Sequence, residues 1–433
     1  MAHLFPPVEW SLNTNMYEVN LRQYTPEGTF KAFAQHLPRL KEMGIHTLWF
    51  MPITPISKEK RQGTLGSYYA CSDYVNTNPE FGSIKDFKGI VKQAHLAGFK
   101  VIIDWVANHT GWDHVWTKSN PEFYKRNAAG EFYDSNNWHD VIDLNYYDHA
   151  MRKKMIEAMK FWVTECDIDG YRCDMAHLVP LDFWRDARMQ LDAVKPLFWL
   201  GETEHINYQA VFDCSYAWHW MHETEKFAKE QIGVQDLVNT LKGYEQKTGR
   251  GSTYLFFTTN HDENSWNGTE YEKYGPAAKA LAVLSCTWNG IPLIYSGQEI
   301  PNIERLKFFD KETIQWTNKN LMHDFYRILL ELRKRNPVFE TAAFQGQLSF
   351  VKTNADQYVM GWRRISGKHE ILVLLNLSSH PHQVKIETEE VTGRYTDVFE
   401  STKHDFSTEK VVSMGAWDSL VLEKHFLKEN KKA

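Results

Sequence analysis

Residues 167–179 of this 433-residue chain read DIDGYRCDMAHLV, a turn with two acids and a glycine that runs into a short strand carrying Arg172 and Asp174. Residues two apart in a strand point to the same face, so the Arg172 guanidinium can hold the Asp174 carboxylate ionised and oriented. A catalytic nucleophile needs both properties. An Arg-x-Asp pair is also common on half-exposed strands, so its meaning depends on the rest of the chain.

Seven further short apolar segments predict strands, and most are followed by a stretch of helical periodicity. They lie at residues 15–24, 46–53, 100–106, 197–202, 211–218, 252–260 and 291–297. Eight strand–helix units predict an α/β fold in which a parallel sheet closes into a (β/α)8 TIM barrel. The helices after the fifth and sixth strands are poorly defined by their periodicity. Elsewhere, Pro38 predicts a kink or a late helix start, and Ser83 with Asp86 predicts a capping box.

Two regions depart from this alternation. Residues 109–145 show no sustained period and predict a small subdomain inserted after the third strand. From about residue 338 the segments alternate in the manner of antiparallel strands. We therefore expect four parts: residues 1–108 as the first part of the barrel, 109–145 as the insertion, 146–337 as the second part of the barrel, and 338–433 as a C-terminal β-sandwich domain.

The composition argues against several classes of partner. The formal net charge is -6, and apart from a short tail at Lys428, Lys431 and Lys432 there is no dense basic run, so we expect no nucleic-acid partner. No segment approaches the roughly 18 apolar residues of a membrane span, and no export signal is recognisable, so we expect a cytoplasmic protein with no membrane partner. The 5 cysteines lack a Cys-x-x-Cys spacing and are expected to be buried thiols.

Polar residues cluster where the predicted barrel strands end, which is where barrels of this kind place their working residues. They are Asp104, Asn108 and His109 after the third strand, Arg172 and Asp174 on the fourth, Glu202 after the fifth, and His261 with Asp262 after the seventh. Each acid has a structural alternative, with Asp104 as an anchor and Glu202 or Asp262 as a cap. Acids at strand ends four, five and seven, each beside an Arg, His or Trp, favour one shared site.

Glycoside hydrolysis requires two acids on either side of the scissile bond, one as nucleophile and one as general acid with a raised pKa. Asp174 beside Arg172 suits the ionised role. Glu202 follows the apolar run FWLG, and burial keeps a carboxyl group protonated near neutrality. Asp262 beside His261 then hydrogen-bonds the sugar and favours a cationic ring.

The segments that carry these residues resemble the signature segments of the alpha-amylase family of glycoside hydrolases. The four strongest are VIIDWVANHT (101–110), GYRCDMAHL (170–178), LGETEHI (200–206) and FTTNHDENS (257–265). VIDLN (141–145) and GIPLIYSGQE (290–299) resemble two weaker ones. All six occur in the family's order, so the set is far more specific than any single member.

The resemblance implies a retaining TIM-barrel enzyme that hydrolyses alpha-1,4-glucosidic bonds in maltodextrins or maltooligosaccharides, with no cofactor required for the chemistry. It implies Asp174 as nucleophile, Glu202 as acid/base and Asp262 as the group that stabilises the transition state. A retaining enzyme predicts about 5–5.5 Å between the first two carboxyl groups. The insertion corresponds to the family's subdomain B, and the C-terminal strands to its domain C.

The resemblance further implies sugar contacts from Tyr69, His109, Arg172 and His261. His177 and Leu178 stand where many members carry a Lys-His pair that contacts the leaving-group side. Asn108 and Asp143 match positions that often hold a structural calcium. Whether calcium binds here stays open, because the insertion lacks a dense cluster of oxygen ligands.

Alternatives to this hydrolase remain. A transglycosylase or an alpha-glucosidase of the same family shares every catalytic residue. A carbohydrate-binding relative without catalysis would not need three intact acids, and a metal-dependent hydrolase would use His109, His177 and the acids as ligands. Chain-length preference, endo or exo attack and oligomeric state are left open by the sequence.

Overall fold

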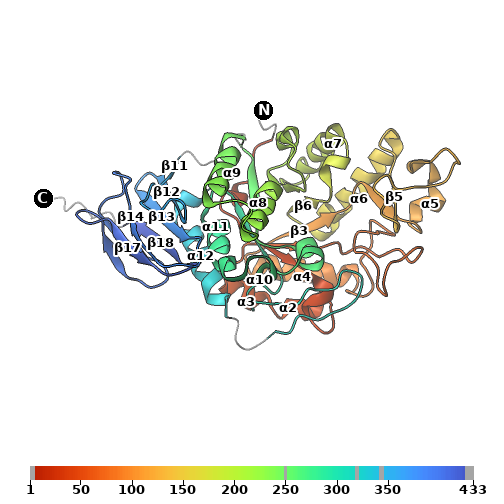
Figure 1. Cartoon of the computed structure of the whole chain (residues 1–433). Coiled ribbons are helices and arrows are strands. Elements are labelled where there is room, and N and C mark those ends of the chain that lie inside the picture. Colours follow the sequence, from red (N-terminus) through yellow and green to blue (C-terminus); the bar gives the residue numbers. More distant parts are fainter. Residues whose placement is uncertain (1–4, 248–250, 317–320, 341–345, 425–433) are drawn as a thin grey trace, which may run out of the picture.

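The computed structural model describes residues 5–247, 251–316, 321–340 and 346–424 (Figure 1). Eight parallel strands close into a barrel in the order β1-β10-β9-β8-β7-β6-β3-β2. The strands are β1 (Met16–Val19), β2 (Thr47–Phe50), β3 (Lys100–Trp105), β6 (Gly170–Cys173), β7 (Phe198–Gly201), β8 (Cys214–Tyr216), β9 (Thr253–Phe256) and β10 (Ile291–Tyr295). Each coincides with one predicted apolar segment, so the (β/α)8 architecture is confirmed.

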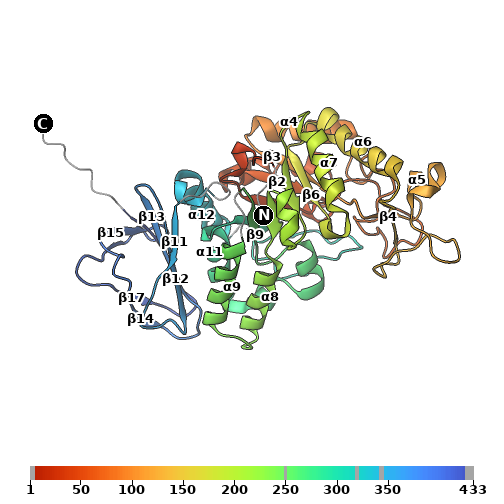
Figure 2. The same ribbon diagram turned by 90° about the horizontal axis from the view of Figure 1, so that it is seen from above.

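Helices pack around the outside of the barrel (Figure 2). They are α1 (Leu21–Tyr24), α2 (Phe30–Ala34), α3 (Leu37–Glu42), α4 (Ile84–Leu96), α6 (His149–Cys166), α7 (Leu181–Asp192), α8 (Trp218–Ala228), α9 (Val234–Lys247), α10 (Glu270–Tyr274), α11 (Ala278–Thr287) and α12 (His323–Arg335). Because helices cover the outer face of the sheet and side chains fill its interior, the strands are apolar on both faces.

Local signals set several helix boundaries. Pro38 lies in the first turn of α3, where its missing N–H is harmless, and the chain breaks between α2 and α3 as predicted. Ser83 and Asp86 form the predicted capping box of α4. After β7 there is only the 3-10 turn η4 (Ile206–Ala210), whereas β8 is followed by both α8 and α9. The absence of an α-helix between β7 and β8 explains the weak helical periodicity after the fifth strand, whereas the sixth strand is followed by two regular helices.

The insertion after β3 is held at its base by a short antiparallel ribbon. Strand β4 (His109–Gly111) pairs with β5 (Val141–Asp143), so that His109 lies opposite Asp143. Between them lie α5 (Val115–Ser119) and the 3-10 turn η2 (Pro121–Phe123). The ribbon therefore begins where β3 ends and keeps the insertion at the carboxyl end of the barrel. We propose residues 109–145 as the bounds of this subdomain.

The C-terminal region is an antiparallel β domain, as predicted. Its main sheet has the order β11-β12-β13-β18-β15-β16, and β14 pairs with β17 in a second, two-stranded sheet. The strands are β11 (Gln347–Phe350), β12 (Val359–Ser366), β13 (His369–Asn376), β14 (His382–Lys385), β15 (Arg394–Asp397), β16 (Lys403–Asp405), β17 (Val411–Met414) and β18 (Ser419–Lys424). In Figure 1 this domain and the insertion lie on opposite sides of the barrel, and only the insertion contributes to the site described below.

The aromatic surplus of the sequence is largely core. Trp49 lies inside the barrel with Met16, Ile102 and Leu255, and further tryptophans are fully buried under the helices. All five cysteines are buried and unpaired, which confirms that prediction. Within the described residues, no helix combines the length and the apolar character that a membrane crossing requires.

Candidate active site

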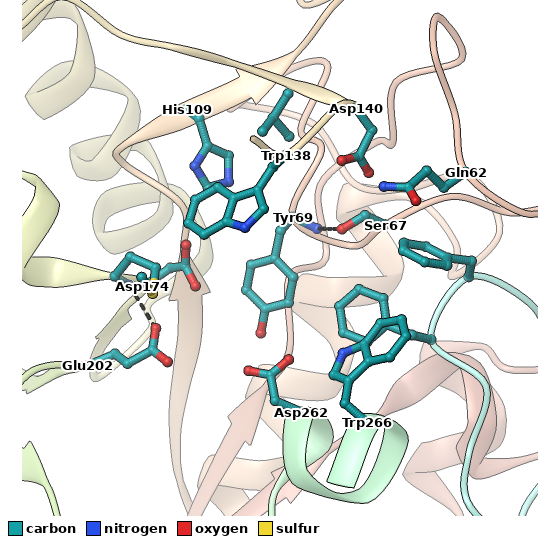
Figure 3. Close-up of a pocket in the computed structure, with 14 residues that line it drawn as sticks. Gln62, Ser67, Tyr69, His109, Trp138, Asp140, Asp174, Glu202, Asp262 and Trp266 are labelled. Atoms are coloured by element: carbon teal, nitrogen blue, oxygen red, sulfur yellow. Dashed lines mark hydrogen bonds between the residues drawn. The ribbon is translucent and has the colours of Figure 1, made fainter. Parts of the chain in front are cut away.

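The polar residues predicted at the strand ends converge on one cavity of about 290 Å³ at the carboxyl end of the barrel. Asp174, Glu202 and Asp262 line it together with Tyr69 and His109 (Figure 3). Arg172 does not line the cavity; it is fully buried and contacts Asp174 and Glu202. The structure therefore brings together side chains from the loop after β2, from β4, from the ends of β6 and β7 and from the segment after β9, up to 193 positions apart in sequence (69 to 262).

Arg172 is the centre of the charge network. Its Nη1 lies 2.9 Å from Asp104 Oδ1 and 2.8 Å from Asp174 Oδ1, and its Nη2 lies 2.9 Å from Glu202 Oε2. Its Nε donates to the Tyr216 hydroxyl at 3.0 Å. The expected pairing of Arg172 with Asp174 is present, but the guanidinium serves three acids at once. Because it is a rigid planar donor, it fixes the candidate nucleophile and the candidate acid relative to each other.

Asp174 and Glu202 are held differently by their surroundings. Asp174 Oδ1 accepts from Arg172, while its Oδ2 is buried and has no hydrogen-bond partner. Glu202 Oε2 accepts from the backbone N–H of Met175 at 2.7 Å. Met175 adopts φ of +41°, a left-handed conformation that is unfavourable for this residue type and turns its N–H towards Glu202.

Burial dominates the acid–base properties of both groups. It raises the pKa of Glu202 to about 7, against the opposing charge of Arg172 and with help from nearby Asp174. Burial also raises the pKa of Asp174, and the Arg172 charge and hydrogen bond oppose that shift. Glu202 was predicted to remain protonated near neutrality, and the direction of its shift agrees.

His261 lies between two carboxylates. Its Nδ1 is 2.5 Å from Glu18 Oε1 and its Nε2 is 3.2 Å from Asp262 Oδ2. Burial lowers the pKa of His261, but the two carboxylates outweigh burial and raise it well above its usual value. For Asp262, burial raises the pKa and His261 lowers it, with a net decrease. A cationic His261 therefore keeps Asp262 ionised at the cavity edge.

Tyr69 forms one wall of the cavity. Its ring stacks on His261 at 5.4 Å between centroids and 20° between planes. Its hydroxyl contacts His261 Nε2 at 2.6 Å and donates to Asp104 Oδ2 at 3.2 Å. Asp104 also accepts a hydrogen bond from Arg172. Asp104 therefore holds Tyr69 and Arg172 in place, which agrees with the structural role considered for it in the sequence analysis. By contrast, the Asp262 side chain makes no capping bond to the following turn.

His109 faces the cavity from the base of the insertion. Burial lowers its pKa to about 4, so the ring is neutral at physiological pH. The Asn108 amide lies 3.2 Å from His109 Nδ1, which favours a proton on Nε2. The Trp138 ring packs edge-on against it at 5.2 Å. His109 is thus a neutral donor, suited to a sugar hydroxyl.

Several cavity residues were not found from the sequence. They are Gln62, Trp138, Asp140, Trp266, Phe308 and Phe309. All except Trp266, which lies in the short π-helical turn η5 (Glu263–Asn267), come from irregular segments, where no periodicity indicates which side of the chain faces the cavity. Glu18, the partner of His261, was also missed, although a charged residue inside the apolar strand MYEV was a usable signal.

A second cavity, of about 600 Å³, adjoins the first. Met175 and Glu202 line both cavities, whereas Asp174 and Asp262 line only the first. The second cavity is walled by His177, His205 and Trp218. The structure thus separates His177 from His109, and among the described residues no cluster of three or more His, Cys, Asp or Glu side chains is arranged to hold a metal ion.

Comparisons with known proteins identify the family. The model of the alpha-amylase catalytic domain matches residues 11–140 and 122–357, which is more than half of the chain. The chain belongs to the alpha-amylase family. Among solved structures, this alpha-amylase-family chain is similar to a noncanonic maltogenic alpha-amylase, AmyB, from Thermotoga neapolitana, with 30% identity, a TM-score of 0.89 and coverage of 96% of this chain and 100% of that one. An alpha-amylase from Lactobacillus plantarum has 27% identity, a TM-score of 0.84 and coverage of 96% and 100%.

Curated relatives are more distant. Alpha-amylase MalA of Haloarcula japonica is 25% identical over 411 residues, which cover 89% of this chain and 59% of MalA. A maltogenic alpha-amylase of Bacillus acidopullulyticus is 24% identical over 440 residues, which cover 88% of this chain and 72% of that enzyme. The chain therefore spans less than two thirds of the length of MalA.

The residues at the position of the family's structural calcium are bonded mainly to other groups of the chain, although Asp143 Oδ1 is buried without a hydrogen-bond partner. Asp143 Oδ2 accepts from Lys125 Nζ at 2.9 Å and from the Ser135 hydroxyl at 2.5 Å. The Asn108 amide is directed at His109. Calcium requires six to eight oxygen ligands, and here the ammonium group of the chain already neutralises the central carboxylate. The prediction of calcium at Asn108 and Asp143 is not supported by this geometry.

Proposed function

We propose that this protein is a retaining glycoside hydrolase that cleaves alpha-1,4-glucosidic bonds in maltooligosaccharides. The observation that carries the proposal is that one buried guanidinium, Arg172, contacts both Asp174 and Glu202. Sharing a single planar group keeps the two carboxyl groups close, in keeping with the separation of about 5–5.5 Å that a retaining mechanism requires. Names of relatives, which include alpha-amylases and cyclomaltodextrinases, support alpha-glucans as the substrate class.

In the first step, the free Oδ2 of Asp174 attacks the anomeric carbon of the sugar. Glu202 transfers its proton to the glycosidic oxygen as the bond to the leaving group breaks. A glycosyl ester forms on Asp174, and the shortened chain departs with the proton. The raised pKa of Glu202, about 7, keeps a substantial fraction of it protonated at neutral pH.

In the second step, Glu202 accepts a proton from a water molecule, which attacks the anomeric carbon and releases Asp174. Two inversions at one carbon retain the alpha configuration. Asp262, kept ionised by His261, stabilises the positive charge that develops on the ring in both transition states. Arg172 balances the negative charge that moves between Asp174 and Glu202.

A transglycosylase is the alternative within the same mechanism. The second cavity, of about 600 Å³, lies on the side where a leaving group departs, and it has room for an acceptor sugar that could replace water. Product analysis at high maltooligosaccharide concentration separates the two activities. Products longer than the substrate would favour transglycosylation.

Substitution of the two carboxyl groups tests the proposal. We expect Asp174→Asn and Glu202→Gln to lower turnover of maltopentaose by about 10⁴-fold or more, with the melting temperature nearly unchanged. Glu270→Gln is a matched control, because Glu270 is also buried with a pKa raised to about 7 but lies outside both cavities. Full activity in either test variant would refute the assignment.

Two further measurements define the mechanism. Azide should restore turnover of an activated aryl glycoside in Glu202→Ala, because a small anion can replace the water that needs a general base. Proton NMR of the first product formed should give the alpha anomer. A beta anomer would exclude the retaining mechanism.

A further inference from the structure

The two cavities that meet at Glu202 differ in how they end, and this difference has a consequence for the mode of attack. We propose that this enzyme attacks its substrate from the non-reducing end and releases short products, because residues 62–67 and 308–310 close the glycone side of the cleft. This inference rests on the proposed function. We call these two segments the end wall.

The direction of the substrate follows from the positions of the acids. Glu202 gives its proton to the leaving group, so the leaving group must lie on the side of Glu202 that faces the second cavity. The sugar that becomes attached to Asp174 must lie in the first cavity, which alone contains Asp174 and Asp262. Figure 3 shows Asp174 and Glu202 on one side of the first cavity and Gln62 and Ser67 on the opposite side. The end wall therefore faces the non-reducing end of the substrate.

The two segments of the end wall are bonded to each other. The backbone N–H and the hydroxyl of Thr64 both donate to Asp310 Oδ1, at 2.8 and 2.6 Å. The Leu65 N–H donates to the Phe309 carbonyl at 3.0 Å. The contact is so close that a Cβ at Gly63, where φ is +61°, would lie 2.5 Å from Phe309 Cβ. A sugar chain has no passage between the segments at this point.

The end wall is also anchored to the barrel. Arg22, which follows β1 and is 1% exposed, donates from Nη1 to the carbonyls of Gly66 and Phe308 at 3.0 and 3.3 Å. The Gln23 amide donates to the carbonyls of Lys307 and Asp310 at 2.7 and 2.8 Å. The Arg22 and Gln23 side chains are buried, and a buried donor is costly to leave without a partner, so these contacts anchor the wall to the barrel.

The insertion supports the same side of the cavity. The backbone N–H of Lys58 donates to Asp113 Oδ2 at 2.9 Å, and Lys60 Nζ lies 3.0 Å from the centroid of the Trp112 ring. The Trp112 indole N–H donates in turn to the carbonyl of His139, between the cavity residues Trp138 and Asp140. The loop that contains Lys58 and Lys60 and the insertion thus contact each other on the glycone side of the cavity.

The sizes of the cavities agree with a short glycone and a longer leaving group. The first cavity, about 290 Å³, lies at the lower end of the range for ligand sites and suits about one or two sugar rings. The second, about 600 Å³, is roughly twice as large and is not closed by the end wall. An internal segment of a long chain cannot place several glucose units on the closed side.

A pair of substrates tests the end wall. One is p-nitrophenyl alpha-maltoheptaoside, and the other is the same compound with an ethylidene group bridging the two terminal hydroxyls of the non-reducing sugar. Cleavage is followed by chromatography of the nitrophenyl products, because a coupling glucosidase would itself degrade the compound whose non-reducing end is free. We expect kcat/KM for the blocked compound to be at least about 100-fold lower, because the blocking group meets a rigid wall.

Two independent variants open the end wall, which is the proposed cause of the difference between the two substrates. Phe309→Ala deletes a ring of the wall, and the double variant Thr64→Ala/Asp310→Ala removes both bonds to the Asp310 carboxylate, leaving the backbone bond from Leu65 to Phe309. Each should raise the blocked-to-free ratio of kcat/KM by about 10-fold. Ile303→Ala is the matched control, because Ile303 lies in the same stretch of chain but is 66% exposed and outside both cavities. Its ratio should equal that of the wild type.

The outcomes are distinguishable. Equal cleavage of both compounds by the wild type would overturn the closed end wall and leave the proposed hydrolase intact. Discrimination that persists in both opened variants, with melting temperatures like that of the wild type, would show that other residues cause it and would also overturn the proposal. If neither compound nor any maltooligosaccharide is cleaved, the proposed function itself fails.

Discussion

The two cavities on either side of Glu202 are built on different physical principles. The first is enclosed by charged and hydrogen-bonded groups that fix one another, from Arg172 and the acids it contacts to the end wall. The second is lined by Glu202, Glu204 and Glu263 and also by His177, His205 and Trp218. The contacts of these three rings are ring against ring, such as the 5.3 Å pair of His177 and His205. Rigid polar networks define one geometry, whereas stacked rings tolerate several. We infer that the enzyme is selective for the sugar bound on the glycone side and accepts different sugars on the leaving-group side.

The strongest test of the rigid side is Arg172→Lys. Lysine retains a charge but cannot contact Asp104, Asp174 and Glu202 together, so both catalytic carboxyl groups lose their shared support. We expect kcat to fall by about 10³-fold, with a smaller change in KM. Steady-state kinetics on maltopentaose measures both constants. A loss below tenfold would mean that the network does not set the geometry.

The next prediction uses the pH dependence. Glu202 must be protonated to act as the acid, and its pKa is about 7, so kcat/KM on maltooligosaccharides should fall as pH rises through about 7. An aryl glycoside whose leaving group needs no proton, such as a 2,4-dinitrophenyl glycoside, should lack this basic limb. If kcat/KM falls in the same way with rising pH for both substrates, the group that titrates is not Glu202.

A smaller effect is expected from Glu18→Gln, which keeps a hydrogen-bonding group beside His261 but removes a charge. The pKa of His261 is raised by Asp262 and Glu18, so the variant should lower that pKa and let His261 lose its proton at a lower pH. Activity should then fall at alkaline pH, by about tenfold relative to the wild type. At lower pH, once His261 holds its proton in both proteins, the two activities should be similar.

On the tolerant side, His177→Ala should have only a modest effect. We expect KM for maltopentaose to rise by about three- to tenfold, since one edge of the leaving-group cavity is lost. Hydrolysis of an aryl glucoside, whose leaving group is too short to extend far into that cavity, should be almost unaffected. Equal losses on both substrates would contradict the division between the cavities.

The smallest effect concerns calcium and the insertion, which carries the cavity residues Trp138 and Asp140. Because Lys125 already neutralises buried Asp143, a strong chelator should leave the melting temperature unchanged. Lys125→Met should lower it by a few degrees, since it leaves the Asp143 carboxylate without its cation. A marked loss of stability in chelator would restore calcium as a component of this site.

The amino-acid sequence by itself determined the barrel and the catalytic carboxyl groups at the carboxyl ends of its strands. The eight strands were predictable because segments such as KVIIDW are apolar on both faces and each is short. Asp174 and Glu202 were predictable because they directly follow such strands, and Asp262 because it lies in the segment after β9. Parallel strands bring their carboxyl ends to one rim. The break at Pro38 and the start of α4 at Ser83 depended on local backbone chemistry alone.

Only the tertiary structure decided how the site is shared and where it ends. The sequence paired Arg172 with Asp174, but closure of the barrel also brings Asp104 and Glu202 to the same guanidinium. Phe309 meets Gly63 across 246 positions (63 to 309), a contact that no periodicity records, because both lie in irregular segments whose direction is set by Arg22 and Gln23 beneath them. Local patterns fix which face of a regular element is buried, whereas the shape of a cleft depends on loops that only long-range contacts hold in place.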